Sequence, residues 1–249
     1  MADLAIRIVQ YNISWCNKES NFNYLNDKLK EISSDLIVLP EMFQTGFSVE
    51  NMEMAESMEG ETMRWLKKKS DLLKTAICGS FLCQEDGLFF NRFVLVKEGE
   101  LVGFYDKVHL FSMGNEHKSL SGGNTKVDMV LNGFKIRPIV CYDLRFPYIS
   151  FNDSEYDILL CPANWPSQRI AHWDALLRAR AIENQAFVVA CNRIGEQDGY
   201  FYPGHSSVYT PSGEQVKHSH KEEILEYTIT KSIIDETRKK LPFLVDRKM

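Results

Sequence analysis

Short apolar runs alternate with amphipathic segments along most of this chain, and this alternation limits the fold more than any other feature. Short continuous apolar runs are typical of buried strands, and apolar residues at helical spacing are typical of helices that cover those strands. The pattern predicts a layered α/β fold. Helices are predicted over 22–32, 59–74 and 169–184, and one more helix is predicted to begin near 146. The predicted strands are 4–10, 35–39, 75–83, 89–97, 101–105, 135–141, 158–161, 186–191, 206–209 and 223–230, with 98–100 turning one hairpin.

The length and composition fit one domain spanning 1–249. With 44% hydrophobic residues, a chain of 249 residues can bury a substantial core without a second domain. The segment 231–249 mixes basic side chains with the apolar run 241–245. Such a tail suits docking on a partner subunit, and packing on its own domain is the alternative.

Three polar residues stand where predicted strands end. Glu41 follows the run 36–40, Lys107 follows the run that includes Phe104 and Tyr105, and Cys141 follows Ile139 and Val140. Ligands of open α/β sheets usually bind at strand ends, so we expect the three side chains to meet there.

The three residue types together suit acyl transfer. A cysteine attacks an amide as a thiolate, which requires a nearby base or cation, and Glu41 and Lys107 supply both. The tetrahedral intermediate also needs an oxyanion donor and a proton for the leaving nitrogen. Alone, Cys141 would be a small core residue, Glu41 a cap and Lys107 a solvated lysine. Together they indicate a cysteine amidohydrolase.

Five sequence blocks strengthen this interpretation. The chain resembles the nitrilase or carbon–nitrogen hydrolase superfamily, and the resemblance covers nearly its whole length. The blocks, in family order, are Leu39-Pro40-Glu41-Met42-Phe43, Tyr105-Asp106-Lys107-Val108-His109-Leu110-Phe111, Cys141-Tyr142-Asp143-Leu144-Arg145-Phe146-Pro147, Pro162-Ala163-Asn164-Trp165-Pro166 and Arg178-Ala179-Arg180-Ala181-Ile182-Glu183-Asn184. The resemblance implies a four-layer α-β-β-α sandwich and a Glu41, Lys107 and Cys141 catalytic triad.

The resemblance also assigns a second glutamate to Glu116, where it would orient Lys107 and the substrate amide. An exposed acidic residue without a role is the alternative there, because the surrounding segment 112–124 is a glycine-bearing loop, which we predict to be a lid. The backbone N–H of Tyr142 is expected to join the oxyanion hole. Asp143 and Arg145 are expected to be structural and to fasten the turn after the cysteine through a charge-assisted hydrogen bond. The candidates for the substrate pocket are Phe43, Trp165, His172, Lys118 and Arg145, and those for binding a far carboxylate are Arg145, Lys118 and Arg169.

Residues after the cysteine separate branches of the superfamily. True nitrilases tend to carry Cys-Trp-Glu, whereas Cys141-Tyr142-Asp143 is similar to the amidase branches. The resemblance is greatest to bacterial omega-amidases, which release ammonia from keto-acid amides such as 2-oxoglutaramate through a thioester, without a cofactor. Deaminated-glutathione amidase and N-carbamoyl amidohydrolase are alternatives of the same fold, and a catalytically silent interaction module is an alternative of another class.

The net charge and the cysteines limit which binding partners and metals are expected. A net charge of −5 and the absence of a basic stripe argue against nucleic acid. The chain shows no leader and no run able to span a bilayer, so we expect a cytoplasmic protein with no membrane partner. The six cysteines lack metal-binding spacing, which predicts free thiols and no zinc. By resemblance, the protein is expected to form a homodimer and to act on a small amide and water.

Overall fold

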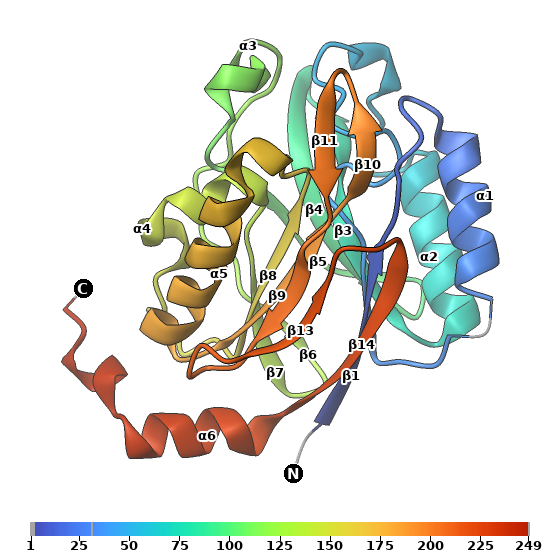
Figure 1. Cartoon of the computed structure of the whole chain (residues 1–249). Coiled ribbons are helices and arrows are strands. Elements are labelled where there is room, and N and C mark those ends of the chain that lie inside the picture. The colour runs from blue at the N-terminus through green and yellow to red at the C-terminus, as the bar shows by residue number, and fades with distance from the viewer. Residues whose placement is uncertain (1–2, 31, 249) are drawn as a thin grey trace.

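The structure is a computed structural model that describes residues 3–30 and 32–248, and in it two β-sheets pack face to face between two layers of helices (Figure 1). The predicted α-β-β-α sandwich is therefore confirmed. Met1 and Ala2, which belong to the segment expected to lack a leader, and Met249, the end of the predicted tail, lie outside the described residues.

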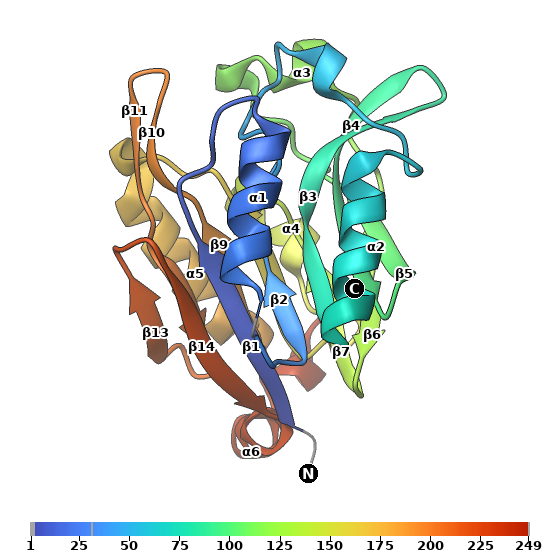
Figure 2. The ribbon, with the colours of Figure 1, turned by 90° about the vertical axis from the view of Figure 1, so that its right-hand side faces the viewer.

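The first sheet has the strand order β14-β1-β2-β3-β4-β5. Its strands are β1 (Asp3–Gln10), β2 (Leu36–Val38), β3 (Ala76–Glu85), β4 (Leu88–Lys97), β5 (Glu100–Asp106) and β14 (Glu223–Thr230). Strands β1, β2 and β3 are parallel, and the others join them in antiparallel pairs. Helices α1 (Lys18–Lys28) and α2 (Glu61–Leu73) cover the outer face of this sheet (Figure 2).

The second sheet has the order β13-β12-β9-β8-β7-β6. Its strands are β6 (Met129–Leu131), β7 (Phe134–Pro138), β8 (Ile158–Ala163), β9 (Phe187–Asn192), β12 (Ser206–Tyr209) and β13 (Gln215–Ser219). Helices α4 (Pro147–Ser150) and α5 (Ile170–Asn184) lie on its outer face (Figure 1). Every residue of β8 and β9 is buried, because parallel strands between two layers have no solvent face. This explains why both read as continuous apolar runs.

Several elements differ from the sequence-based expectation. The first helix ends at Lys28 although apolar spacing continues to Ile32, and the helix expected from 146 is a single turn, preceded by a 3-10 segment over Cys141–Arg145. Strands β6 and β13 and the hairpin of β10 (Ile194–Gln197) and β11 (Tyr200–Pro203) were missed. These strands are short, and many of their residues are exposed or only partly buried, so their apolar alternation is weak.

The tail folds back on its own chain. It forms helix α6 (Lys231–Lys240), whose Ile234 is buried, and then a 3-10 turn over Phe243–Asp246. Arg238 donates hydrogen bonds to the carbonyls of Gln185 and Tyr156. These contacts fasten one face of the tail to the second sheet's side of the molecule. Leu241, Phe243 and Val245 remain exposed.

Candidate active site

Glu41 is fully buried in the turn that follows β2. The backbone N–H of Met42, which has a φ of 44°, donates to the Ser80 hydroxyl at 3.0 Å. The next N–H, of Phe43, donates to the Ser80 carbonyl at 3.1 Å. Gly79 permits this close approach, because a Cβ there would lie 2.9 Å from Cβ of Leu39. The turn is therefore fixed against β3.

Lys107 follows β5 and points its ammonium between two carboxylates. Its Nζ lies 2.9 Å from Oε1 of Glu41 and 2.9 Å and 3.0 Å from the two carboxylate oxygens of Glu116. All three side chains are fully buried. Its own backbone N–H donates to the Asn91 carbonyl of the neighbouring strand at 3.0 Å, which sets where the side chain starts.

Glu116 opens the short helix α3 (Glu116–Ser119), within the segment that we expected to form a lid. Its carboxylate accepts hydrogen bonds from the Phe111 backbone N–H at 2.6 Å and from the Asn91 amide at 3.1 Å. The same Asn91 amide donates to Glu41 at 2.8 Å. Asn91 thus bridges the two glutamates. Sequence reasoning missed it, because an asparagine within a strand carries no motif of its own.

Cys141 occupies a sharp turn after the second-sheet strand β7. Its φ is 45°, a left-handed conformation that costs energy for a residue with a side chain and persists only where surrounding contacts hold it. Asp143 supplies those contacts, but the expected bond to Arg145 is wrong within the described residues, because the Arg145 guanidinium packs on Trp165 instead. Its carboxylate accepts from the Val140 N–H at 3.0 Å, the Tyr105 hydroxyl at 2.8 Å and the His109 N–H at 2.8 Å. The turn is thereby locked with the thiol presented to the site.

Asn164, at the end of β8, completes the surroundings of Glu41. Its backbone N–H donates to Oε2 of Glu41 at 2.8 Å, and its side-chain amide donates to the Glu41 carbonyl at 2.6 Å. One carboxylate oxygen therefore contacts Lys107 and Asn91, and the other contacts Asn164. The Cys141 thiol is a further influence that lowers the pKa of the Glu41 carboxylate. Both groups line the same cavity.

Burial and charge set the protonation of these groups. Burial raises the pKa of Glu41, but the Lys107 ammonium and the Asn164 N–H outweigh it and leave that pKa below its ordinary value. Burial, followed by the negative charge of Glu41, raises the pKa of the Cys141 thiol well above its ordinary value. The pKa of Glu116 is raised, chiefly by burial. The resting pair at neutral pH is therefore a thiol beside a carboxylate, and attack requires proton transfer to Glu41.

This protonation pattern predicts the pH dependence of the reaction. Because the reactive form needs ionised Glu41, kcat/KM is expected to fall on the acid side only as the pH drops below the ordinary glutamate value of 4.5. Because the pKa of the thiol lies above 9, no rise in kcat/KM is expected between pH 7 and 9. A pH profile of kcat/KM tests both limbs. A rise of about tenfold per unit from pH 7 that levels off above about pH 8.5, as for a free thiol ionising alone, would contradict the assignment.

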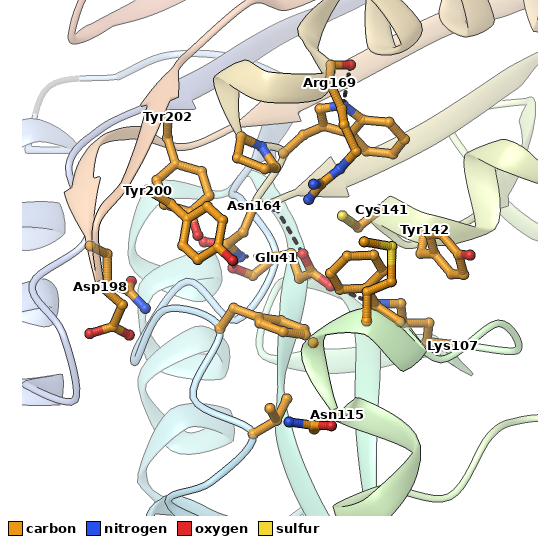
Figure 3. Close-up of a pocket in the computed structure, with 18 of the residues that line it drawn as sticks. Glu41, Lys107, Asn115, Cys141, Tyr142, Asn164, Arg169, Asp198, Tyr200 and Tyr202 are labelled. Carbon is orange, nitrogen blue, oxygen red and sulfur yellow. Dashed lines mark hydrogen bonds and ion pairs between the residues drawn. The ribbon is translucent and has the colours of Figure 1, made fainter.

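The thiol opens into a cavity of about 410 Å³ (Figure 3). Glu41, Lys107, Cys141 and Tyr142 are among the residues that line this cavity. The remaining lining combines aromatic rings with a few polar groups, which is the usual character of a small-molecule site. Further lining residues are Trp15, Phe47, Phe111, Met113, Asn115, Asn164, Trp165, Asp198, Tyr200 and Tyr202.

Two arginines also line the cavity. Arg145 packs its guanidinium 4.7 Å from the Trp165 ring centre, and Arg169 packs 5.2 Å from that of Phe111. Within the described part of the chain, neither guanidinium forms an ion pair with a carboxylate. Arg169 lowers the pKa of Arg145 further after burial does, so the two positive charges repel each other. The pair is an arrangement suited to an anionic group.

The predicted pocket residues divide into two groups. Trp165 and Arg145 line the cavity, whereas Phe43, Lys118 and His172 do not. Phe43 is buried in the first-sheet core against Phe22 and Trp65, because its strand-end position turns it toward the covering helices. Lys118 is exposed on α3, and exposed His172 contacts Arg145 at 3.2 Å through its ring nitrogen.

Sequence reasoning also missed one wall of the cavity. The β10–β11 hairpin contributes Gln197, Tyr200 and Tyr202, and its paired strands place these residues near Cys141 although about 60 residues separate them in sequence. The aromatic spacing of 200–202 was the available signal, since alternate residues of a strand share one face. Tyr202 is buried and Tyr200 is exposed.

A four-layer sandwich that holds a thiol, a carboxylate and an ammonium at its strand ends defines a class of cysteine amidohydrolases. Comparisons with known proteins agree. The family model of carbon–nitrogen hydrolase matches residues 5–239. The chain belongs to the carbon–nitrogen hydrolase family, whose members here include hydrolases that act on amides.

Individual relatives extend this match over nearly full length. The omega-amidase YafV of Escherichia coli is 39% identical, over 97% of this chain and 96% of its own. The 2-oxoglutaramate amidase of Bacillus subtilis is 32% identical, also over 97% and 96%. A CN-hydrolase superfamily protein of Xanthomonas campestris, solved with an arsenic adduct in its active site, is 37% identical with a TM-score of 0.96, and the match covers 100% of this chain and 98% of that one.

Proposed function

We propose that this enzyme is an omega-amidase, which hydrolyses the terminal amide of a small keto-acid amide such as 2-oxoglutaramate. The arginine pair beside the thiol carries this proposal, because such a substrate bears a carboxylate a few bonds from its amide. Relatives named omega-amidase and 2-oxoglutaramate amidase support it.

The proposed reaction begins with proton transfer from the Cys141 thiol to Glu41 as sulfur attacks the amide carbon. The C–S bond forms, and the carbonyl oxygen takes the electron pair as an oxyanion. The Lys107 ammonium and the Tyr142 N–H stabilise that oxyanion, and Glu116 holds Lys107 in place. The intermediate collapses with cleavage of the C–N bond, and Glu41 returns its proton to the departing nitrogen. Ammonia leaves and a thioester remains.

The second half-reaction uses the same groups. Glu41, ionised again, takes a proton from water while the water oxygen attacks the thioester carbon. The C–S bond breaks, and the proton passes back to sulfur. The products are the keto diacid and the free thiol, so the cycle is balanced with no cofactor or metal.

Ammonia release from three substrates tests the proposal. The enzyme should release ammonia rapidly from 2-oxoglutaramate, and slowly or not at all from a nitrile or an N-carbamoyl amino acid. Carbon dioxide released from the carbamoyl compound would favour the carbamoyl amidohydrolase instead. Activity on deaminated glutathione that exceeds activity on 2-oxoglutaramate would favour that amidase. A folded protein that leaves every amide untouched would favour the silent module.

Arg169→Met is expected to raise KM for 2-oxoglutaramate by about 10- to 100-fold, because a charge-assisted hydrogen bond is worth about 1.5–3 kcal/mol. Arg145→Met should act in the same direction. Steady-state kinetics on 2-oxoglutaramate and on a neutral amide of similar length, such as butyramide, measures the effect. Only the anionic substrate should lose affinity. An equal loss for both amides would mean that the arginines shape the cavity without binding a carboxylate.

We also propose that the whole chain acts as one domain in a cytoplasmic homodimer, with the tail at the subunit interface. The exposed Leu241, Phe243 and Val245 support the interface. The six free cysteines suit a reducing compartment. In the part of the chain that the structure describes, helices fall short of the length and apolarity needed to cross a bilayer. Light scattering on the wild type and on Phe243→Asp tests the dimer, which the charge should dissociate.

A further inference from the structure

Three histidines meet at an edge of the second sheet, outside the cavity lining. His205 lies between β11 and β12, His218 lies in β13, and His220 follows that strand. The antiparallel pairing of β12 with β13 brings them together, because it sets Ser206 opposite Ser219. The His205 N–H donates to the Ser219 carbonyl at 2.8 Å. The cluster is thus fixed by backbone contacts.

The three rings have the geometry of a facial metal site. One ring nitrogen from each histidine lies within 4.8 Å of the others. The rings stand nearly perpendicular in every pair, at 86° to 89°, with centres 4.3 to 4.6 Å apart. Nε2 of His218 lies 2.9 Å from Nε2 of His220. Two imidazole nitrogens bound to one zinc ion are about 3.3 Å apart in a tetrahedral site, so only a small shift would admit the ion.

Neighbouring groups orient two of these rings. Nδ1 of His205 lies 3.0 Å from the carboxylate of Asp174 on α5, which leaves Nε2 as the nitrogen available to a metal. Nδ1 of His218 lies 3.0 Å from the Ser207 hydroxyl, whose own proton goes to the His205 carbonyl. The amide nitrogen of Gln215 lies 3.2 Å from the same Nδ1, so both contacts hold the His218 ring through this atom and leave its Nε2 toward His220. A carboxylate behind the ring is a usual support of a histidine ligand, and Asp174 supplies one for His205.

We propose that His205, His218 and His220 form a binding site for one divalent transition-metal ion, with zinc as the test ion and water as the fourth ligand. Three neutral imidazoles favour zinc, copper or nickel over calcium and magnesium, which prefer oxygen ligands. His220 is exposed, so the ion can enter from solvent. The prediction of no zinc was based on the spacing of the cysteines, whereas the proposed site has histidine ligands only.

A bound ion would tie separate elements together. It would join β13 to the β11–β12 connection and, through Asp174, to α5. The Trp173 indole on that helix donates to the His205 carbonyl at 2.9 Å and packs against Trp165, which lines the active-site cavity. A bound ion would therefore act as a structural metal that stabilises the elements next to the cavity. The three histidines are not among the residues that line the cavity, so this proposal does not rest on the proposed reaction.

Zinc titration of metal-free protein by calorimetry tests the proposal. All proteins carry Cys141→Ala, because the active-site thiol beside Glu41 is itself a potential zinc ligand. We expect one zinc ion per chain. His218→Ala and His220→Ala should each weaken the affinity at least tenfold. His117→Ala, which removes an exposed histidine on α3, is the matched control and should bind zinc unchanged.

A second variant and a second measurement distinguish loss of a zinc ligand from misfolding of the variant. Asp174→Asn keeps all three ligands and should weaken zinc binding about 10- to 100-fold, as other losses of a supporting carboxylate do. Zinc should raise the thermal unfolding midpoint of the His117→Ala control but not that of His218→Ala. Absence of saturable zinc binding, or equal binding by the control and the His218 and His220 variants, would overturn the site.

Discussion

Cys141→Ala is expected to abolish amide hydrolysis, with kcat lowered by on the order of 10⁴-fold or more. The substitution removes the sulfur that forms the thioester, and Glu41 and Lys107 have no alternative nucleophile to activate. Substrate binding should survive, because the arginine pair and the aromatic lining remain. Ammonia release from 2-oxoglutaramate gives the rate, and calorimetry gives the dissociation constant.

The matched control is Cys83→Ala, which removes a buried thiol of β3 that lies outside the cavity lining. It should keep wild-type kcat. Iodoacetamide should inactivate the wild type and this control at similar rates, since both keep the reactive thiol. Residual activity of Cys141→Ala within tenfold of the wild type would remove this residue from the mechanism.

Lys107→Met is expected to destabilise the protein by about 3–5 kcal/mol and to lower kcat by about 10²- to 10³-fold. The stability effect arises because Glu41 and Glu116 would remain buried without their cation. The kinetic effect arises because the oxyanion would lose a charged donor. Urea unfolding measures the first effect, and steady-state kinetics measures the second.

A double variant separates the two effects. Lys107→Met with Glu116→Gln removes one of the two stranded carboxylates, so it should recover part of the lost stability while activity stays low. Glu116→Gln alone should lower kcat by about 10²-fold, because Lys107 would lose the partner that positions it, while Cys141 stays reactive to iodoacetamide. A double variant as unstable as Lys107→Met would show that uncompensated charge is not the cause of the lost stability.

The central part of the site was predictable because its members end apolar runs. Glu41, Lys107 and Cys141 each follow a strand that can be predicted from the apolar run of its own residues. The layered fold then places the ends of these strands near one another. Glu116 was less distinct in sequence, since a four-residue helix in a long connection has no periodicity to read. Its burial follows from the Lys107 ammonium, which lies nine residues earlier.

Other features were invisible before the chain was folded. Asn91 serves both glutamates only because β4 lies between the β2 and β5 strands of the first sheet, after which Glu41 and Glu116 follow. Arg145 and Arg169 share a cavity because two connections after the second-sheet strands converge there. Phe43 belongs to the block that resembles the family, yet it packs in the core. Motif position alone does not say which way a side chain points.

The sequence by itself determined the layered α/β class and the trio Glu41, Lys107 and Cys141, because hydrophobic periodicity and motif blocks are properties of neighbouring residues. The four layers followed only from the resemblance of those blocks to a known family. The tertiary structure decided which charges are compensated, which arginines among residues 3–30 and 32–248 lie outside ion pairs, and which histidines meet. Those properties depend on distances between residues far apart in the chain, and strand pairing and layer packing set such distances. The His205, His218 and His220 cluster is the clearest case, since only the pairing of β12 with β13 brings its first member to the other two.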